Sequence, residues 1–209
     1  MSQHSLKKPD AYKIAIVGEG GVGKSSLVER IIKERFSGEV SSTIGAAFAT
    51  YRHGGNTYQL WDTAGQERYQ ALIPMYLRNA RIVLLVYDVN ESDSVRRLEN
   101  HWVDFVLANA EGCFMIMIGN KCDIDDLLIK KQIEYVGELS KQYGCLHLVV
   151  SAKTGENTGE IFKQIDKFVA EDKLRNLEIP GTIGTVQLSP FDDKVNTSGR
   201  CLPGTCVIL

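Results

Sequence analysis

The sequence of 209 residues lacks the features that would place it in several special classes of protein. No stretch approaches the roughly 18 apolar residues of a membrane-spanning helix, and the first ten residues lack the apolar core of a secretory signal. Ser2 stands where N-myristoylation requires a glycine. The formal net charge is only −2, so the bulk charge does not indicate a nucleic-acid partner. We therefore expect an ordinary soluble globular protein.

Cysteine is also scarce, and its number and spacing do not fit a disulfide scaffold. The five cysteines are odd in number and widely spread, so we expect reduced thiols. Cys145 and His147 lie close in an apolar segment, but no second pair stands at ligand spacing. A metal site is therefore not predicted there.

Hydrophobic runs alternate with amphipathic segments from residue 12 to about residue 174. This alternation predicts an α/β domain over 11–174, with a mostly parallel six-stranded sheet and helices on both faces. The expected strands are 12–18, 46–52, 56–61, 82–88, 114–119 and 146–150. Expected helices begin at Lys24 and lie around 95–105, 133–143 and 161–169. Residues 1–10 and 175–209 lack this pattern and are predicted to be flexible.

A phosphate-binding loop is predicted where the first strand meets the first helix. The segment Gly18-Glu-Gly-Gly-Val-Gly-Lys24-Ser25 matches the pattern G-x-x-x-x-G-K-S, and its strand–helix context supports the match. Glycines let backbone amides approach phosphate oxygens at a helix N-terminus. Lys24 would bridge the β- and γ-phosphates, and the Ser25 hydroxyl would bind Mg²⁺. The predicted nucleotide contacts here are Glu19, Gly20, Gly21, Val22, Gly23, Lys24, Ser25 and Ser26.

Asp62-Thr-Ala-Gly65-Gln66 follows another strand, at the sheet edge where ligands gather. Asp62 would hold Mg²⁺ through water, and the Gly65 amide would meet the γ-phosphate. Gln66 would orient an attacking water molecule. Without the phosphate loop, the same segment would be an ordinary turn.

Two further loops predict selectivity for guanine. In Asn120-Lys121-x-Asp123 a carboxylate would accept two donors on the guanine edge, which adenine does not offer. Such a site discriminates strongly because a wrong base leaves buried groups unpaired. Asn120 and Lys121 would brace the loop and cover the base. The segment Ser151-Ala152-Lys153 would present an amide to the guanine oxygen.

These motifs resemble those of the Ras superfamily of small GTPases and, within it, the early-endosomal branch of the Rab family. The resemblance covers residues 10–174 and includes Ser42-Thr-Ile-Gly-Ala-Ala-Phe48, Trp61 to Tyr69, and Pro74-Met-Tyr76. It implies that Thr43 binds Mg²⁺ when a γ-phosphate is present and supports catalysis with Gln66 and Lys24.

The resemblance also implies that Phe36 stacks on the guanine and that three aromatic residues contact effectors. These are Phe48, Trp61 and Tyr76, although Trp61 could equally be an ordinary core residue. Leu77 and Asn79 stand where endosomal Rabs usually have Tyr and Gly, so the effector surface is expected to differ there. No arginine of the chain has an evident position to complete the catalytic site.

The chain ends in Cys206-Val-Ile-Leu209, a C-a-a-X box whose terminal leucine favours geranylgeranylation of Cys206. One lipid chain holds a protein only marginally, and the charges of residues 175–209 cancel. A second signal is therefore expected, either lipidation of Cys201 or capture by a membrane-resident partner.

The predicted function is a GTP/GDP switch that hydrolyses GTP and times vesicle or endosomal traffic. The resemblance implies the cytosolic face of an endosomal membrane, with cycling through the cytosol. It also implies an exchange factor, a GTPase-activating protein, a GDP-dissociation inhibitor or prenyl-binding chaperone, and trafficking effectors. One alternative is Ras- or Rho-like signalling, which the absence of a Rho-type insert between Asn120 and Ser151 disfavours. Another is a nucleotide-binding scaffold that does not cycle, which an intact Ser25, Thr43 and Gln66 disfavour.

Overall fold

The computed structural model describes residues 11–38, 42–123 and 127–177. The predictions for residues 1–10 and for the segment beyond Leu177 lie outside the described residues. Those predictions include the lipidation of Cys201 and Cys206.

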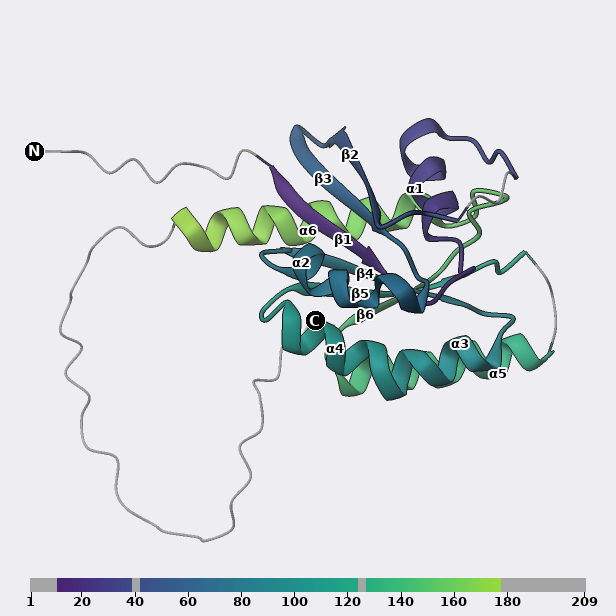
Figure 1. Cartoon of the computed structure of the whole chain (residues 1–209). Helices are drawn as coiled ribbons and strands as arrows, with labels where there is room; N and C mark the ends of the chain where they lie inside the picture. Colours follow the sequence, from purple (N-terminus) through teal and green to yellow (C-terminus); the bar gives the residue numbers. More distant parts are fainter. Residues whose placement is uncertain (1–10, 39–41, 124–126, 178–209) are drawn as a thin grey trace, which may run out of the picture.

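The centre of the molecule is a six-stranded sheet, as predicted (Figure 1). Its strands lie in the order β2-β3-β1-β4-β5-β6, and every neighbouring pair is parallel except β2 and β3. The β4 strand is buried along its whole length, which explains its uninterrupted apolar sequence. The strands are β1 (Tyr12–Val17), β2 (Ala46–His53), β3 (Asn56–Thr63), β4 (Ile82–Asp88), β5 (Phe114–Asn120) and β6 (Leu146–Val149).

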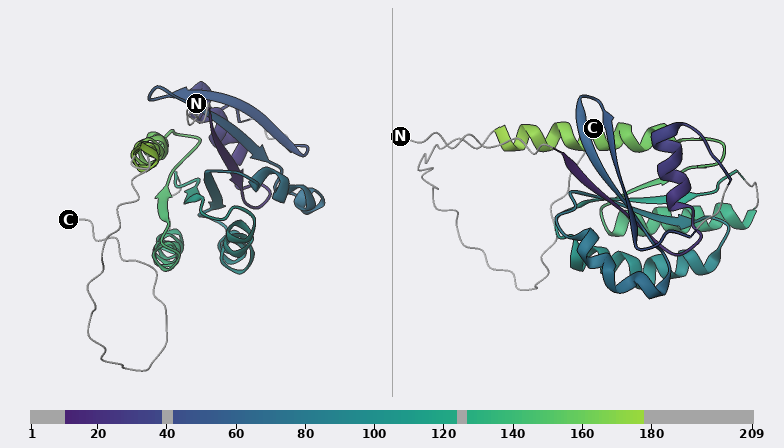
Figure 2. Two further views of the ribbon diagram at one scale, coloured as in Figure 1. Left: turned by 90° about the vertical axis from the view of Figure 1, so that its left-hand side faces the viewer. Right: turned by 45° about the horizontal axis from the view of Figure 1, so that its top comes forward.

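Helices cover both faces of the sheet, and each face has its own hydrophobic core (Figure 2). One face packs against α1 (Lys24–Lys33) and α6 (Thr158–Leu177) through residues such as Ile14, Leu27 and Ile165. The opposite face packs against the remaining helices, which contribute Val103 and Val136 to the second core. These helices are α2 (Ile73–Leu77), α3 (Ser92–Arg97), α4 (Val103–Asn109) and α5 (Leu127–Gln142).

The structure departs from the sequence prediction in three places. The α6 helix continues to Leu177, three residues past the predicted end of the domain. The single helix expected around 95–105 is interrupted by a π-helical segment, η2 (Leu98–Trp102), between α3 and α4. A 3₁₀ segment, η1 (Glu67–Leu72), and α2 follow β3, where hydrophobic spacing had marked no helix.

The expected effect of Leu77 on the effector surface is wrong, because its side chain is fully buried. Leu77 is the last residue of α2, and its side chain belongs to the hydrophobic core on that face of the sheet. Asn79 is exposed and has a left-handed φ of 60°, a conformation that glycine adopts most easily.

The carboxyl ends of the parallel strands β1, β3, β4, β5 and β6 meet at one edge of the sheet. The phosphate loop and the motifs that begin at Asp62, Asn120 and Ser151 lie at or directly after the ends of β1, β3, β5 and β6. Thr43 precedes β2, whose first residue lies at the same edge because β2 runs antiparallel to β3. In parallel α/β sheets, this edge is where ligands bind. Within the described residues, no helix combines the length and the apolar character needed to cross a membrane.

Candidate functional site

A cleft of about 780 Å³ opens at this edge of the sheet. Its volume lies within the range of small-molecule and cofactor sites, about 300 to 1,000 Å³. Fifteen of its lining residues are among the site residues predicted from the sequence. These are Gly20, Gly21, Gly23, Lys24, Ser25, Ser26, Phe36, Thr43, Gly65, Gln66, Asn120, Lys121, Asp123, Ala152 and Lys153. The fold therefore brings segments from five different parts of the chain around one space.

The phosphate loop is built around a buried lysine. The Lys24 side chain is only 5% exposed, and its Nζ donates hydrogen bonds to the backbone carbonyls of Gly18 at 2.9 Å and Glu19 at 2.6 Å. Burial lowers the pKa of Lys24 to about 8, and the negative charges of Asp62 and Glu19 offset part of this effect. A buried, hydrogen-bonded cation beside a helix N-terminus is a suitable partner for phosphate oxygens.

Gly65 packs directly against this loop. A Cβ atom at residue 65 would collide with the Glu19 carbonyl and with the Lys24 ammonium group. Only glycine fits this close approach, which places the 65–66 backbone beside the lysine. The turn after β3 and the phosphate loop therefore form one continuous wall of the cleft.

Three oxygen-bearing side chains provide ligands suited to a magnesium ion. The hydroxyl oxygens of Ser25 and Thr43 are 2.8 Å apart, although the residues belong to different segments. Asp62 is buried, and its Oδ1 has no hydrogen-bond partner among the described residues. Burial raises the pKa of Asp62, while the Ser25 hydroxyl and the Lys24 charge act in the opposite direction. Hydroxyl and carboxylate oxygens are the hard ligands that Mg²⁺ prefers, so the residues fit this ion.

Hydrogen bonds join the two segments that border the phosphate end of the cleft. The Gln66 side-chain amide donates to the Ser42 hydroxyl at 3.1 Å. The Ala64 backbone N–H donates to the Gly45 carbonyl at 2.8 Å. A group bound between Thr43 and Gly65 would therefore contact both segments at once.

The opposite end of the cleft is organised by the buried side chain of Asn120. Its amide nitrogen donates to the Val22 carbonyl at 2.9 Å, and its oxygen accepts from the Ala152 backbone N–H at 3.0 Å. Asn120 thus joins the phosphate loop to the loop after β6. These two hydrogen bonds fix the positions of the phosphate loop and of the loop after β6 relative to Asn120.

Asp123 is held as an ionised acceptor. Its carboxylate accepts hydrogen bonds from the Ser151 hydroxyl at 2.8 Å and the Lys153 ammonium at 3.2 Å. Burial alone would raise the pKa of Asp123, but these hydrogen bonds keep it below its ordinary value. A carboxylate of this kind can accept two adjacent N–H donors of a base. Phe36, which is 39% exposed, and Lys121 line the same cleft.

Sequence analysis missed two side chains that hold the base-binding loops in place. Arg30, on α1, donates to the backbone carbonyls of Ala152 at 2.8 Å and Lys153 at 2.6 Å. Asp88, at the end of β4, forms an ion pair of 2.6 Å with Lys121. Their motif partners lie far away in the sequence, so no local spacing could have revealed these contacts.

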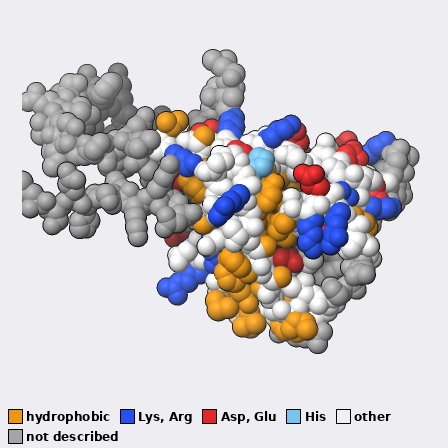
Figure 3. Space-filling view, turned by 90° about the horizontal axis from the view of Figure 1, so that it is seen from above, with side chains coloured by type: hydrophobic (Ala, Val, Ile, Leu, Met, Phe, Trp, Pro, Cys, Tyr) orange, Lys and Arg blue, Asp and Glu red, His pale blue; other side chains and the backbone are white. Residues whose placement is uncertain are grey.

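The three predicted effector-contact aromatics form a row across β2, β3 and α2. Ring centroids are 5.0 Å apart for Phe48 and Trp61, and 5.6 Å apart for Trp61 and Tyr76. Phe48 is 52% exposed, whereas Trp61 is partly buried and so has features of both a surface and a core residue. Ile44, which precedes β2, and Met75, in α2, are also exposed. The space-filling view in Figure 3 shows hydrophobic side chains gathered at its lower edge.

Comparison with known proteins decides the family. A family model described as the Ras family matches residues 13–171, about three quarters of the chain. The chain belongs to the Ras family. GTP-binding protein ypt5 of Schizosaccharomyces pombe is 36% identical over 196 residues, which cover 90% of this chain and 92% of the relative.

Two further relatives have similar identity. Ras-related protein Rab-5A of Dictyostelium discoideum is 35% identical over 188 residues, covering 87% of this chain and 90% of the relative. Ras-related protein Rab-31 of Homo sapiens is 35% identical over 194 residues, covering 90% and 96%. The chain is thus a Rab-like small GTPase, a GTP hydrolase of the kind that works in vesicle trafficking.

Proposed function

We propose that this GTPase binds guanine nucleotide with Mg²⁺ in the cleft and uses the γ-phosphate to set the conformation of the two adjoining segments. The observation that carries the proposal is that the two ends of one cleft have different chemistry. The ionised Asp123 lies at one end, and Lys24 with the Ser25–Thr43–Asp62 oxygens lies at the other. A base with adjacent N–H donors and a triphosphate match these two ends.

The proposed chemistry needs no side-chain nucleophile. Mg²⁺, held by Ser25 and Thr43 and through water by Asp62, would supply positive charge to the phosphates. Lys24 donates to phosphate oxygens, and the glycine-rich backbone supplies further N–H donors. Gln66 orients the attacking water, and Thr43 ties the first segment to the site when a γ-phosphate is present. The readout is the order of two segments, which we call the first switch segment (residues 37–45) and the second switch segment (residues 64–77).

We further propose that the GTP form acts on an endosomal membrane. This is supported by the relatives named Rab-5A and Rab-31 and by the exposed Phe48 beside Trp61 and Tyr76, which would contact trafficking effectors. Lipidation of Cys206, with Cys201 as a second site, would provide the anchor. An exchange factor, a GTPase-activating protein and a GDP-dissociation inhibitor or prenyl-binding chaperone would drive the cycle.

Phosphate release by the purified chain tests the nucleotide proposal. We expect release from GTP, none above background from ATP, and loss of release when Mg²⁺ is chelated. Lys24→Ala should abolish release. Lys141→Ala is a matched control because Lys141 is exposed and, within the part of the chain that the structure describes, its ion pair is with Glu138 on its own helix. Equal release from GTP and ATP would contradict guanine selectivity. Binding of GTP without any release would favour the non-cycling scaffold.

A localisation experiment tests the membrane proposal separately. The tagged chain should accumulate on endosomes in cells, and Cys206→Ser should leave it in the cytosol. Cys201→Ser would show whether the second cysteine contributes. Stable endosomal residence of the Cys206→Ser variant would contradict the proposed lipid anchor.

A further inference from the structure

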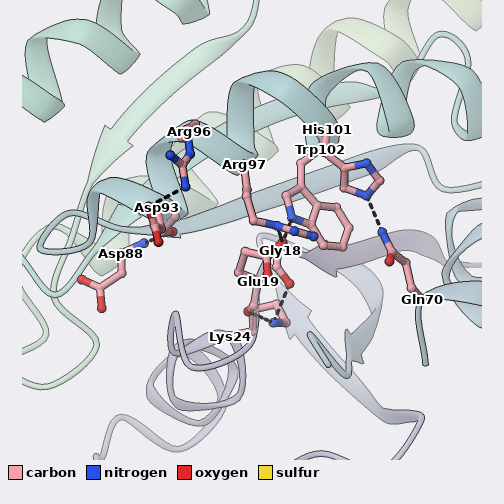
Figure 4. A network of polar contacts seen from close by, with 11 residues as sticks. Gly18, Glu19, Lys24, Gln70, Asp88, Asp93, Arg96, Arg97, His101 and Trp102 are labelled. Atoms are coloured by element: carbon pink, nitrogen blue, oxygen red, sulfur yellow. Dashed lines mark hydrogen bonds and ion pairs between the residues drawn. The ribbon is translucent and has the colours of Figure 1, made fainter. Parts of the chain in front are cut away.

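The side chain of Glu19 points toward Arg97 and Trp102 (Figure 4), and Glu19 is not among the residues that line the cleft. Its Oε1 accepts a hydrogen bond from Arg97 Nε at 2.6 Å and another from Trp102 Nε1 at 2.7 Å. Arg97 ends α3, and Trp102 ends the π-helical segment η2. A single carboxylate oxygen thus ties the phosphate loop to residues about 80 positions further along the chain.

The backbone of the same residue is in contact with two parts of the catalytic site. The Glu19 carbonyl accepts the hydrogen bond of Lys24 at 2.6 Å. The same carbonyl is the surface against which Gly65 packs, with no room for a Cβ atom. Any shift of Glu19 would therefore move the carbonyl that binds Lys24 and, with it, the Gly65 backbone at the start of the second switch segment.

The η2 segment also contacts the second switch segment directly. His101 Nε2 is hydrogen-bonded to the side-chain amide of Gln70 in η1. Between the two segments, Glu19, Gly65, Gln66 and Arg97 border a space of about 20 Å³, large enough for one water molecule and little more. Single π-helical turns inside α-helices often occur at functional sites. Here the π segment ends at Trp102, next to His101, so it presents one donor to Glu19 and one ring nitrogen to Gln70.

We propose that Arg97 and Trp102 are positioning residues for phosphate binding and hydrolysis. They hold Glu19, and through its carbonyl they fix Lys24 and Gly65, while His101 holds the second switch segment against η2. The inference rests on the proposed nucleotide function of the cleft. We assign Arg97 no direct contact with phosphate, because its side chain is directed to the Glu19 carboxylate. It acts only through that carboxylate.

Neighbouring arginines provide a matched pair of variants. Arg97 pairs with Glu19 across the structure, whereas Arg96 pairs with Asp93 on its own helix and both of those side chains are largely exposed. In Figure 4, Arg96 and Arg97 lie on adjacent positions but are directed to different partners. Arg97→Ala should speed GDP dissociation and slow single-turnover GTP hydrolysis, each by roughly three- to tenfold. Arg96→Ala should leave both rates within about 1.5-fold of the wild type.

A second variant removes the other donor with little change in packing. Trp102→Phe keeps an aromatic ring against His101 and Phe105 but lacks the indole N–H. It should change the two rates in the same direction as Arg97→Ala. Glu19→Gln retains an oxygen acceptor for both donors and should stay closer to the wild type than Glu19→Ala. Thermal melting in saturating GDP should be recorded for each variant. A merely structural contact would lower the Tm, but the rates of GDP dissociation and GTP hydrolysis would not follow the order predicted for these variants.

The outcomes separate this inference from the proposed function. Binding and hydrolysis of GTP by the wild type test the cleft itself, whatever the role of Arg97. If the wild type hydrolyses GTP but Arg97→Ala and Trp102→Phe match Arg96→Ala in both rates, the positioning role is overturned. Equal rates for Glu19→Gln and Glu19→Ala would also contradict it, because the retained hydrogen bonds would then have no effect.

Discussion

Replacing Asp123 by Asn should convert a strong guanine site into a weak one. In the proposed complex, the carboxylate accepts two N–H donors of guanine, whereas an Asn amide offers one acceptor and places its own donor against the other N–H. Hydrogen bonds to a charged group contribute about 1.5 to 3 kcal/mol each. Loss of two such bonds corresponds to a rise in the Kd for GDP of roughly 10²- to 10⁴-fold.

The change in Asp123 should act on binding far more than on folding. Its partner Lys153 is 66% exposed, and surface ion pairs contribute little to stability. The remaining partner is the Ser151 hydroxyl, which can also donate to an amide oxygen. We therefore expect the free energy of unfolding of the nucleotide-free variant to fall by only about 1 kcal/mol.

Displacement of a fluorescent GDP analogue measures this effect directly. Unlabelled GDP and xanthosine diphosphate should be compared, because xanthine carries an oxygen where guanine carries an amino group. Asp123→Asn should lose affinity for GDP and gain affinity for xanthosine diphosphate, since the Asn amide can donate to that oxygen. Asp93→Asn is the matched control, because Asp93 is exposed on α3 and, among residues 11–38, 42–123 and 127–177, its ion pair is with Arg96 of the same helix. A change in the GDP Kd below threefold, with the fold intact, would refute the role of Asp123.

Three further predictions concern the phosphate end and the junction of the loops. Gln66→Leu should slow single-turnover GTP hydrolysis by roughly an order of magnitude or more while GTP still binds, and an unchanged rate would exclude the water-positioning role. Bound phosphate requires protonated Lys24, whose pKa is lowered to about 8 by burial in the unliganded protein. The Kd for GDP should thus be nearly constant around pH 7 and rise above pH 8 by up to about tenfold per unit, whereas calorimetry with no pH dependence between pH 7 and pH 9 would contradict this. Asn120→Ala should lower the free energy of unfolding by about 2 to 4 kcal/mol because it leaves the Val22 carbonyl and Ala152 N–H unpaired. Asn109→Ala is the control in denaturant unfolding, because the half-buried Asn109 amide donates to the Phe105 carbonyl of its own helix and joins no distant segments.

The strands and the motif loops could be predicted because their causes are local. Continuous apolar runs arise where a strand is covered on both faces, as β4 is. Gly54-Gly55 marks the hairpin between β2 and β3 because both residues have positive φ. Once the strand ends were placed, the parallel order of the sheet brought the motif loops to one edge.

The remaining features depend on contacts between distant segments. Val95, Leu98 and Trp102 have a spacing that suits a regular helix as well as one with a π segment, so the interruption at η2 could not be read from periodicity. The partners of Arg30 and Arg97 lie on other elements, which only the assembled fold brings near. Leu77 was expected to alter the effector surface only because endosomal Rabs usually have Tyr there. The short α2 helix has too few turns for hydrophobic spacing to show that Leu77 is buried.

The central claim is that the terminal phosphate of the nucleotide controls the order of two loops. Hydrogen exchange tests this claim most directly. The wild-type chain should be compared when loaded with GDP and with a non-hydrolysable GTP analogue, both with Mg²⁺. We predict that backbone amides in residues 37–45 and 64–77 exchange more slowly with the analogue, while those of the central strands β1, β4 and β5 are unchanged. Identical exchange of both loops in the two states would contradict the account.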